Sequence, residues 1–400
     1  MKAPCSLFAA CALSIAARGA EPPPLESATG ANGPGAAEGL GRSRGGPLVV
    51  AGYAHSCATD VAGKVFCWGD NSKGELGNGG TASSAVPVEV YGLPGPVTAL
   101  SAGGGYTCAV SAGRVYCWGD DYFGGLGDGK VQAVDPSPVA FGGPALEGTR
   151  FTDVRTEADS MTVCALADTG QVWCAGYNNH GQLGAGITND SPFPVRVRNV
   201  TGPIVARSLA VGGDFGCATA VDPAHYACWG DNDHGQFGNV SAAGSLFATL
   251  VPGTYALLFA GAGSVCGLVP GRPLECWGAG AGGQRAHGGW SDGYMVSKLP
   301  NVVNLSLGAS HTCAVVEDGR VFCWGDNGSG QLGDGSMTNQ DAPVKTVQGL
   351  PPAAAVAAGL YHTCAATQDG HVWCWGWNSS GEVGPKVRIG DKAGTPVLVR

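Results

Sequence analysis

The sequence has little charge and no concentration of basic residues. Only 13% of its 400 residues are charged, and 31 acidic against 22 basic side chains give a formal net charge of −9. Proteins that bind nucleic acid usually carry a basic patch or stripe, and no run of Lys or Arg occurs anywhere in this chain. We therefore expect no nucleic-acid partner.

The motifs that indicate catalysis or a bound cofactor are also missing. The Gly-rich segments lack the G-K-[ST] of a phosphate-binding loop, and no C-x-x-C pair of the kind common in zinc sites is present. No Ser-His-Asp or Cys-His arrangement recurs in a usable context, and the Asp-Gly pairs at 318–319 and 369–370 are typical of turns. We expect no enzymatic activity, no cofactor and no metal site.

Glycine, by contrast, is abundant. The chain contains 69 Gly residues while 44% of its residues are hydrophobic. Glycine in a helix interior costs about 1 kcal/mol relative to alanine, so long helices are disfavoured. The composition favours many short strands joined by tight turns, and it does not favour disorder.

The N-terminus resembles an export signal. Lys2 precedes a mostly apolar stretch, Pro4 to Ala17, which is too short to span a bilayer, and Ala17-Arg18-Gly19 offers a cleavage pattern. A second interpretation is a lipobox at 8–11, with a lipid anchor on Cys11. We expect a signal over residues 1–20, a flexible Gly/Pro-rich linker over 21–47, and a secreted, periplasmic or cell-surface location.

Seven repeats occupy the rest of the chain. Each contains a Cys, a short polar turn, and a second Cys followed by W-G or a near match, and most continue with N-x-x-G-x-L-G. The second cysteines lie 50, 57, 54, 48, 47 and 51 residues apart. Several repeats end in a Pro-Val strand, as at Pro343-Val344.

Each repeat predicts four short strands. In the sixth, these are Val302 to Leu307, Thr312 to Val316, Arg320 to Trp324 and Pro343 to Val347, with Asp318-Gly319 as a hairpin turn. Seven such units predict an all-β, seven-bladed β-propeller over residues 48–400 with four antiparallel strands per blade. The first repeat starts with its first strand and the last ends with its fourth, so closure is flush or offset by one strand.

Strand alternation predicts how the blades pack. In 65–68, Phe66 and Trp68 point to one face of the sheet, and Val65 and Cys67 point to the other. We expect the aromatic face of one blade to pack on the Val/Cys face of the next. The third repeat has Ala175 where the others have the Trp of W-G.

The cysteines outside the signal divide two per repeat, with spacings of 9 to 11 residues. Cysteines opposed across a hairpin lie within disulfide range. Zinc sites between blades and free thiols in a reducing compartment are the alternatives. We expect seven disulfides within blades, formed by Cys57 and Cys67, Cys108 and Cys117, Cys164 and Cys174, Cys217 and Cys228, Cys266 and Cys276, Cys313 and Cys323, and Cys364 and Cys374.

The pattern G-x-x-H-[ST]-C-A followed by G-x-V-x-C-W-G-x-N-x-x-G-x-L-G resembles the regulator-of-chromosome-condensation repeat family, in its cysteine-rich bacterial form. The resemblance implies a seven-bladed propeller. Members of this family include nuclear exchange factors for a small GTPase, ubiquitin-ligase-associated propellers and secreted bacterial inhibitors of β-lactamases. Exchange factors of this family use a β-wedge inserted in one blade and a basic N-terminal arm. No repeat here shows an obvious extra hairpin, and the linker lacks a basic arm, so no exchange-factor residue is carried over.

Three histidines, His55, His311 and His362, share one repeat position. Other repeats place Tyr106, Phe215 or other residues there, which favours a structural role over metal binding. Loops between first and second strands and between third and fourth strands emerge on one propeller face and collect the least repetitive residues. The residues predicted to bind a partner are Tyr53, Tyr122, Phe123, His180, Asp214, His234, Arg285, Trp290, Tyr294, Tyr361 and Trp377.

Exposed aromatics with Arg and His are typical of protein interfaces. The sequence therefore favours a monomeric, non-catalytic, secreted or surface propeller that binds a protein or glycan ligand as a recognition or inhibitory module. The alternatives are a guanine-nucleotide exchange factor, on family analogy alone, and a surface-mounted adhesive propeller, which differs mainly in lipidation at Cys11.

Overall fold

The computed structural model describes residues 47–220, 222, 224–238, 243–280, 283, 295–297, 299, 301–345 and 349–400. The predicted signal and all of the predicted linker except Pro47 lie outside these residues, so both stay predictions. The unit that contains the repeats is almost entirely β-structure.

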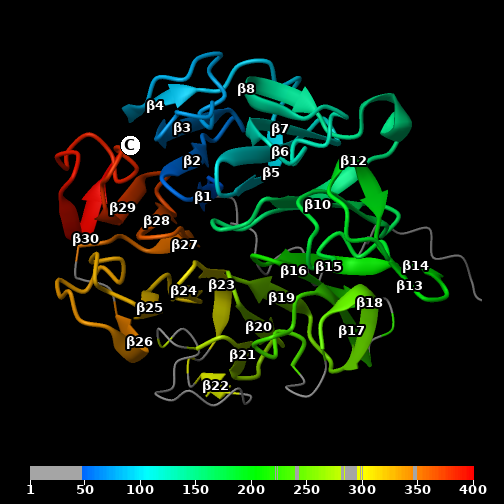
Figure 1. Cartoon of the computed structure of the whole chain (residues 1–400). Helices are drawn as coiled ribbons and strands as arrows, with labels where there is room; N and C mark the ends of the chain where they lie inside the picture. The colour runs from blue at the N-terminus through cyan, green and yellow to red at the C-terminus, as the bar shows by residue number, and fades with distance from the viewer. Residues whose placement is uncertain are drawn as a thin grey trace, which may run out of the picture. The chain divides into compact units, whose positions relative to one another are not determined.

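Seven four-stranded antiparallel sheets form a ring, which confirms the predicted seven-bladed propeller (Figure 1). Each sheet takes its strands in sequence order, so that every repeat makes one blade. The first strand of each blade is innermost and the fourth is at the rim (Figure 1). Each blade is a meander of four consecutive strands, and the next repeat forms the neighbouring blade, so the chain runs once around the ring.

The strands have the following bounds. The first three blades comprise β1 (Val49–Ala51), β2 (His55–Thr59), β3 (Val65–Gly69), β4 (Ser84–Glu89), β5 (Val97–Ala102), β6 (Tyr106–Ser111), β7 (Arg114–Asp121), β8 (Gln132–Ala140), β9 (Phe151–Arg155), β10 (Thr162–Ala167), β11 (Val172–Gly176) and β12 (Ser191–Arg196). The other four comprise β15 (Ala206–Val211), β16 (Phe215–Ala220), β17 (His225–Gly230), β18 (Ser245–Pro252), β19 (Leu257–Ala260), β20 (Ser264–Leu268), β21 (Leu274–Gly278), β22 (Met295–Ser297), β23 (Val302–Leu307), β24 (His311–Val316), β25 (Val321–Gly325), β26 (Gln340–Lys345), β27 (Ala353–Ala358), β28 (His362–Thr367), β29 (Val372–Trp377) and β30 (Lys392–Leu398).

The ring closes flush. Blade 1 contains β1 to β4 and blade 7 contains β27 to β30, with no strand exchanged across the seam. The seam is held by hydrogen bonds from blade 1 to blade 7: Trp68 Nε1 donates to the Glu382 carbonyl at 2.9 Å, and the Ser56 hydroxyl donates to the same carbonyl at 3.1 Å. Of the two closures that the sequence allowed, the structure has the flush one.

Two details differ from the sequence prediction. In the sixth blade the fourth strand begins at Gln340, three residues before Pro343, because Gln340 still pairs with Gly325 across a register shift. Between the third and fourth blades, β13 (Arg198–Asn199) and β14 (Gly202–Pro203) form a small hairpin. The expectation that no repeat carries an extra hairpin is therefore wrong here: the side chain of Asn199 accepts hydrogen bonds from the backbone N–H groups of Thr201 and Gly202 and so stabilises the turn.

The Gly of each W-G motif is required by the backbone. Gly325 has φ of +108°, and a Cβ there would lie 2.6 Å from the Ser310 carbonyl oxygen. Gly69 has φ of +109° with the Ala54 carbonyl oxygen at 2.5 Å. Both the left-handed conformation and the close approach of two chain segments exclude a side chain, which explains why Gly176 persists although its repeat lost the Trp.

The core lies between the blades. Trp68 of the first blade packs in one cluster with Cys364 and Cys374 of the seventh, and Trp118 of the second packs with Cys57 and Cys67 of the first. The aromatic face of one blade thus covers the Val/Cys face of its neighbour, as the strand alternation predicts. Six Trp side chains are fully buried in this way, Trp68, Trp118, Trp229, Trp277, Trp324 and Trp375.

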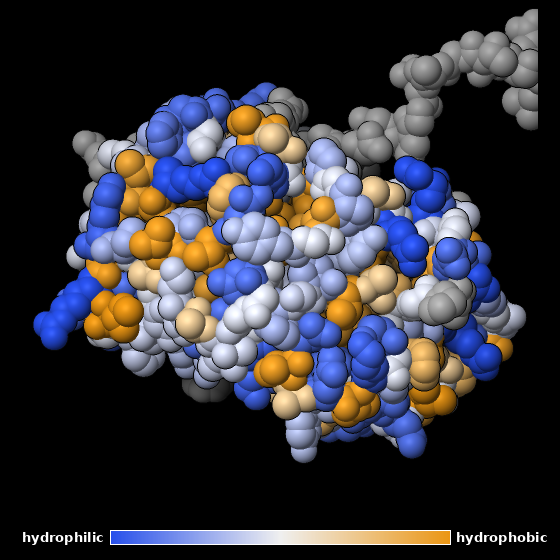
Figure 2. All heavy atoms as spheres, turned by 90° about the horizontal axis from the view of Figure 1, so that it is seen from above, coloured by the Kyte–Doolittle hydropathy of each residue, from blue (hydrophilic) through white to orange (hydrophobic). Residues whose placement is uncertain are grey.

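Proline protects the outer strands. A rim strand has one unpaired edge that could pair with another chain, and proline removes a donor from that edge. Pro87, Pro194, Pro343 and Pro396 all lie in fourth strands. On the side seen in Figure 2, apolar residues are scattered among polar ones and form no single broad patch.

Candidate functional site

The loops at one end of the blades form the candidate site, here called the loop face. It consists of the loops from first to second strands and from third to fourth strands, which lie at the same end of a meander. The third-to-fourth loops share one internal scaffold. In the first blade, Asn71 Oδ1 accepts the Leu76 N–H at 2.9 Å while Nδ2 donates to the carbonyls of Gly80 and Ala82 at 3.0 Å each.

The same asparagine scaffold recurs around the ring. Asn178, Asn327 and Asn378 each accept the N–H five residues later and donate to carbonyls further along the loop. The second blade has Asp121 there, whose Oδ1 accepts the Leu126 N–H at 3.1 Å. Its Oδ2 is buried with no hydrogen-bond partner in the described structure, and burial raises the pKa of Asp121 to about 6.

A second contact joins each of these loops to the next blade. The residue before the Leu of x-L-G presents its carbonyl to a Trp indole N–H: Trp118 donates to Glu75 and Trp375 to Gln331, each at 2.8 Å. Trp229 donates in the same way to Gln182 at 2.8 Å. The loop face is therefore built on rigid scaffolds, with each loop fixed internally and to the neighbouring blade.

The shared histidine position is structural, as predicted. His311 Nε2 lies 2.8 Å from the Thr363 hydroxyl, which itself donates to the Gln331 carbonyl at 2.8 Å. Because Thr363 donates its hydroxyl proton to Gln331, the hydroxyl oxygen must accept a hydrogen bond from the Nε2–H of His311. His55 and His362 make the matching contacts to Thr107 and Ser56. Burial lowers the pKa of His55 and His311 to about 4 and that of His362 to about 3, so all three stay neutral.

Aromatic side chains emerge on the loop face in two groups. Tyr122 and Phe123 have ring centroids 4.9 Å apart, and Phe123 lies 4.8 Å from Tyr177 of the next blade. Across the face, Tyr361 and Trp377 are 5.6 Å apart. Tyr122 is 67% exposed, the largest exposure of these aromatic side chains. Paired, exposed aromatics on a rigid frame can supply contact area at low entropic cost.

Acidic side chains accompany them. Glu75 is buried, and burial together with the Asp70 and Asp120 carboxylates raises its pKa to about 7. Glu157 is also buried, and burial raises its pKa to about 8. Desolvation and the neighbouring Asp214 raise the pKa of Asp159. Two Lys ion pairs of the described chain lie in loop-face loops, Lys73 with Asp120 at 3.7 Å and Lys130 with Asp128 at 2.7 Å.

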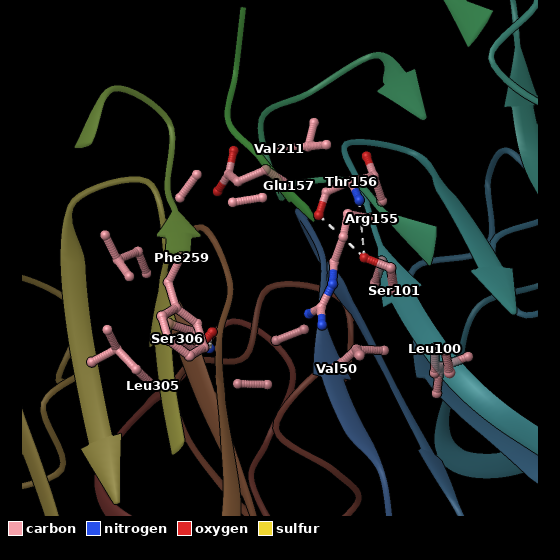
Figure 3. Close-up of a pocket in the computed structure, with 18 of the residues that line it drawn as sticks. Val50, Leu100, Ser101, Arg155, Thr156, Glu157, Val211, Phe259, Leu305 and Ser306 are labelled. Carbon is pink, nitrogen blue, oxygen red and sulfur yellow. Dashed lines mark hydrogen bonds between the residues drawn. The ribbon is translucent and has the colours of Figure 1, made fainter. Parts of the chain in front are cut away.

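The centre of the ring is a channel with a hollow of about 150 Å³ lined by the seven innermost strands (Figure 3). Most of its lining is small or apolar, as at Ala51, Ala102 and Ala260. Ser101 and Ser306 are polar members of the lining, and the third blade supplies the charged ones, because β9 and the loop after it bring Asp153, Arg155 and Glu157 to the channel. In Figure 3 the Arg155 side chain extends away from the Glu157 carboxylate, and its Nε donates to Asp153 Oδ2 at 2.9 Å.

The structure places most of the residues predicted to bind a partner on the loop face, in the loops of different blades. Tyr53, Tyr122, Phe123, His180, Asp214, His234, Tyr361 and Trp377 all lie in loop-face loops or at their strand ends. Arg285, Trp290 and Tyr294 lie outside the described residues. Their role as binding residues stays a prediction in every case.

Sequence reasoning missed three residues of this face, Tyr177, Glu157 and Asp159. Tyr177 follows Cys174-Ala175-Gly176 at the position that Trp377 occupies in the seventh repeat, so a column-by-column comparison of repeats would have found it. No such signal marks the two acids, because the loop after β9 has no counterpart of equal length in its neighbours.

Each blade holds one disulfide between its second and third strands, and the seven pairs are those expected: Cys57–Cys67, Cys108–Cys117, Cys164–Cys174, Cys217–Cys228, Cys266–Cys276, Cys313–Cys323 and Cys364–Cys374. Among the described residues, no cluster of three or more His, Cys, Asp or Glu side chains is arranged to hold a metal ion. The same residues contain no helix with the length and hydropathy to cross a bilayer.

Two known proteins are similar to this chain in sequence. The ultraviolet-B receptor UVR8 of Arabidopsis thaliana is 30% identical over 346 residues, which are 84% of this chain and 66% of UVR8. The E3 ubiquitin-protein ligase HERC2 of Homo sapiens is 28% identical over 195 residues, 48% of this chain and 4% of HERC2. The chain thus spans just under two thirds of the first relative and a small part of the second.

Among solved structures, Prp20p of Saccharomyces cerevisiae, described with its binding properties to Gsp1p and histones, matches with a TM-score of 0.73. It is 21% identical, and the match covers 91% of this chain and 88% of Prp20p, which supports the fold alone. A family model described as an RCC1-like domain matches residues 38–400. Because that model spans the entire propeller, the chain belongs to the RCC1-like domain family.

Proposed function

We propose that this protein is an exported, non-catalytic propeller that binds a protein ligand on its loop face. The observation that carries the proposal is the pair of exposed aromatic groups on a rigid loop scaffold, Tyr122–Phe123–Tyr177 and Tyr361–Trp377. Protein interfaces are enriched in such residues at their centres. RCC1-like propellers also include Prp20p, whose reported partners are proteins.

The disulfides support the exported location. Fourteen described cysteines are all paired, and disulfides persist mainly in oxidising compartments outside the cytosol. Intact mass with thiol alkylation, measured on protein from its own cells, tests this. We expect labelling only after reduction and an N-terminus trimmed near Gly19 or lipidated at Cys11. Fourteen labelled thiols on an uncleaved chain would overturn the proposal and favour an intracellular regulator.

A pair of substitutions tests the binding face. Tyr122→Ser and Trp377→Ser together remove an exposed aromatic from each group, and Tyr91→Ser is the matched control. Tyr91 is 63% exposed and follows β4, which places it at the opposite end of the blade. The three proteins are used as bait for cross-linking in the exported fraction of the native cells.

We expect a protein captured by the wild type and by the Tyr91 variant, with at least tenfold loss for the double variant. Equal capture by all three would contradict binding on the loop face. A capture that glycosidase treatment abolishes would indicate a glycan ligand instead. Accelerated nucleotide release from a small GTPase by the purified protein would favour the exchange-factor alternative.

A further inference from the structure

The loop face carries an unbalanced line of carboxylates that starts at the channel. Glu157, Asp159, Asp214 and Asp231, here called the acidic row, run from the channel lining across the third and fourth blades. Glu157 Oε2 accepts the Asp159 N–H at 2.8 Å. Asp159 is exposed and Asp214 is half-buried. Desolvation is the main cause that raises the pKa of each, and the charge of Asp214 adds to it at Asp159, as that of Asp231 does at Asp214.

The inner end of the row is incomplete. Glu157 is only 4% exposed, and within the described structure no group donates a hydrogen bond to its Oε1. A buried carboxylate oxygen without a partner costs free energy that a donor would recover. None of the described ion pairs involves Glu157, Asp159 or Asp214. Asp214 instead accepts a hydrogen bond from Gln182 Nε2 at 2.9 Å. His180 partly offsets the rise in the pKa of Asp214 that desolvation causes.

The channel mouth beside Glu157 suits an aliphatic stem that ends in a positive charge. Six of the seven innermost strands end there in small or apolar residues, Ala51, Ala102, Val211, Ala260, Leu307 and Ala358, and the seventh, β9, ends in Arg155. Lys and Arg side chains pack their methylene groups on such surfaces and keep the charged end on a polar partner. Arg155 does not fill this role, because it is paired with Asp153 and extends away from Glu157 (Figure 3).

We propose that the channel mouth is an anchor site for one basic side chain, Arg or Lys, of the protein ligand, with Glu157 Oε1 as its principal acceptor. The acidic row draws the cationic segment toward the mouth, and the anchor residue completes the hydrogen bonding of the buried carboxylate. This proposal rests on the proposed binding function of the loop face, since it assigns the ligand a residue.

The test uses a probe rather than the ligand. Acetyl-Gly-Arg-Gly-amide is titrated into the disulfide-intact protein at low salt by calorimetry, and the citrulline peptide, which has the same shape without the charge, is the comparison. The titrations are run at pH 9, where Glu157 is mostly ionised, so that Glu157→Gln removes the acceptor's charge without changing its size. Asp233→Asn removes one charge from an exposed residue near the outer end of the acidic row and is the matched control.

We expect the arginine peptide to bind at least tenfold more tightly than the citrulline peptide. Glu157→Gln should lose at least tenfold, and Asp233→Asn no more than twofold. Equal binding of the two peptides would overturn the proposal, and so would equal losses in the two variants, because long-range attraction alone would then suffice. Absence of arginine-peptide binding would also overturn it, while the capture experiment would still report on the loop face independently.

A pH series gives a second readout. With a pKa of about 8 for Glu157, roughly one tenth of it is ionised at pH 7 and nine tenths at pH 9. Affinity for the arginine peptide should therefore rise roughly tenfold over that range and release a proton on binding. Asp159 on its own loop and Tyr106 of β6 act on Glu157, and the paired Asp153 and Arg155 of β9 line the same channel. The rise should vanish in Glu157→Gln. A rise that persists in that variant would contradict the assignment.

Discussion

Asp121→Asn should stabilise the protein. Asn71, Asn178 and Asn327 use their amide to donate to loop carbonyls, whereas Asp121 Oδ2 is buried without a partner in the described structure. By the same sequence offset, the carbonyls of Lys130 and Gln132 are the acceptors that an amide at 121 would meet. The substitution would replace the unpartnered Oδ2 of Asp121 by an amide NH₂ group that can donate to these two carbonyls.

The magnitude follows from the titration of Asp121. Burial raises its pKa from 3.8 to about 6, so the folded state holds the proton more tightly than the unfolded state. The stability penalty therefore grows as the pH rises from 3.8 to about 6, and it stays at no more than about 3 kcal/mol from there to pH 8. Solvent near the loop screens part of this, and we expect a gain of about 1 to 2 kcal/mol for the asparagine variant.

Urea unfolding followed by tryptophan fluorescence, with disulfides intact, measures the gain at pH 8 and pH 4.5. The difference between variant and wild type should be largest at pH 8 and should shrink as the pH falls through 6, because protonation removes the wild-type penalty. Asp233→Asn, an exposed change of equal charge, should shift neither value by more than about 0.5 kcal/mol. An asparagine variant no more stable than wild type at pH 8, or a gain unchanged at pH 4.5, would refute the reasoning.

Three further changes probe the blades. His362→Gln should reduce the loss of stability between pH 7 and pH 5 by about 2 kcal/mol. Burial lowers the pKa of His362 from 6.5 to about 3, so below pH 6.5 this histidine binds a proton in the unfolded state and not in the folded state, which favours unfolding. Replacing Cys313 and Cys323 together by Ser should cost about 3 kcal/mol of unfolding free energy in urea, since the bridge closes a loop of about ten residues. Gly325→Ala should cost at least about 2 kcal/mol in the same assay, because φ is +108° and the Ser310 carbonyl lies 2.6 Å from the new Cβ.

Matched variants separate these effects from general damage. His234→Gln changes an exposed loop-face histidine and should leave the pH dependence as it is. Gly328→Ala alters the same blade as Gly325, but its Cβ would meet nothing closer than the Asp326 carboxylate at 3.7 Å. If Gly328→Ala costs as much as Gly325→Ala, the backbone explanation for the W-G motif fails.

Local chemistry explains how much of the fold was predictable. Cys313 and Cys323 flank an Asp-Gly turn, so that pairing within one hairpin needs no information from distant residues, and the structure has that pairing. Trp324 and Phe322 alternate with Val321 and Cys323, so the two faces of the blade follow from strand period. The fourth strand of the same blade was placed three residues late, because its start is fixed by pairing with Gly325 across a bulge and not by its own sequence.

The candidate site was predictable only in outline. Repeat comparison shows which positions vary, and on that ground it predicts Tyr122 and Trp377 as binding residues. It could not show that Tyr177 completes one aromatic group, since that contact joins two blades. Nor could it show that Glu157 is buried at the channel, because burial depends on how the loop after β9 sits against the ring.

The number of repeats sets the number of blades, and contacts within one repeat of about fifty residues set the order of strands and the cysteine pairs, so all three follow from the sequence. The flush seam, the acidic row and the unpartnered oxygen of Glu157 follow only from the tertiary structure. The seam joins the two ends of the chain, as in Ser56 against Glu382, while the acidic row and the buried oxygen depend on how consecutive blades and the loop after β9 pack. Local periodicity carries no information about which groups of neighbouring blades meet or which remain unpaired.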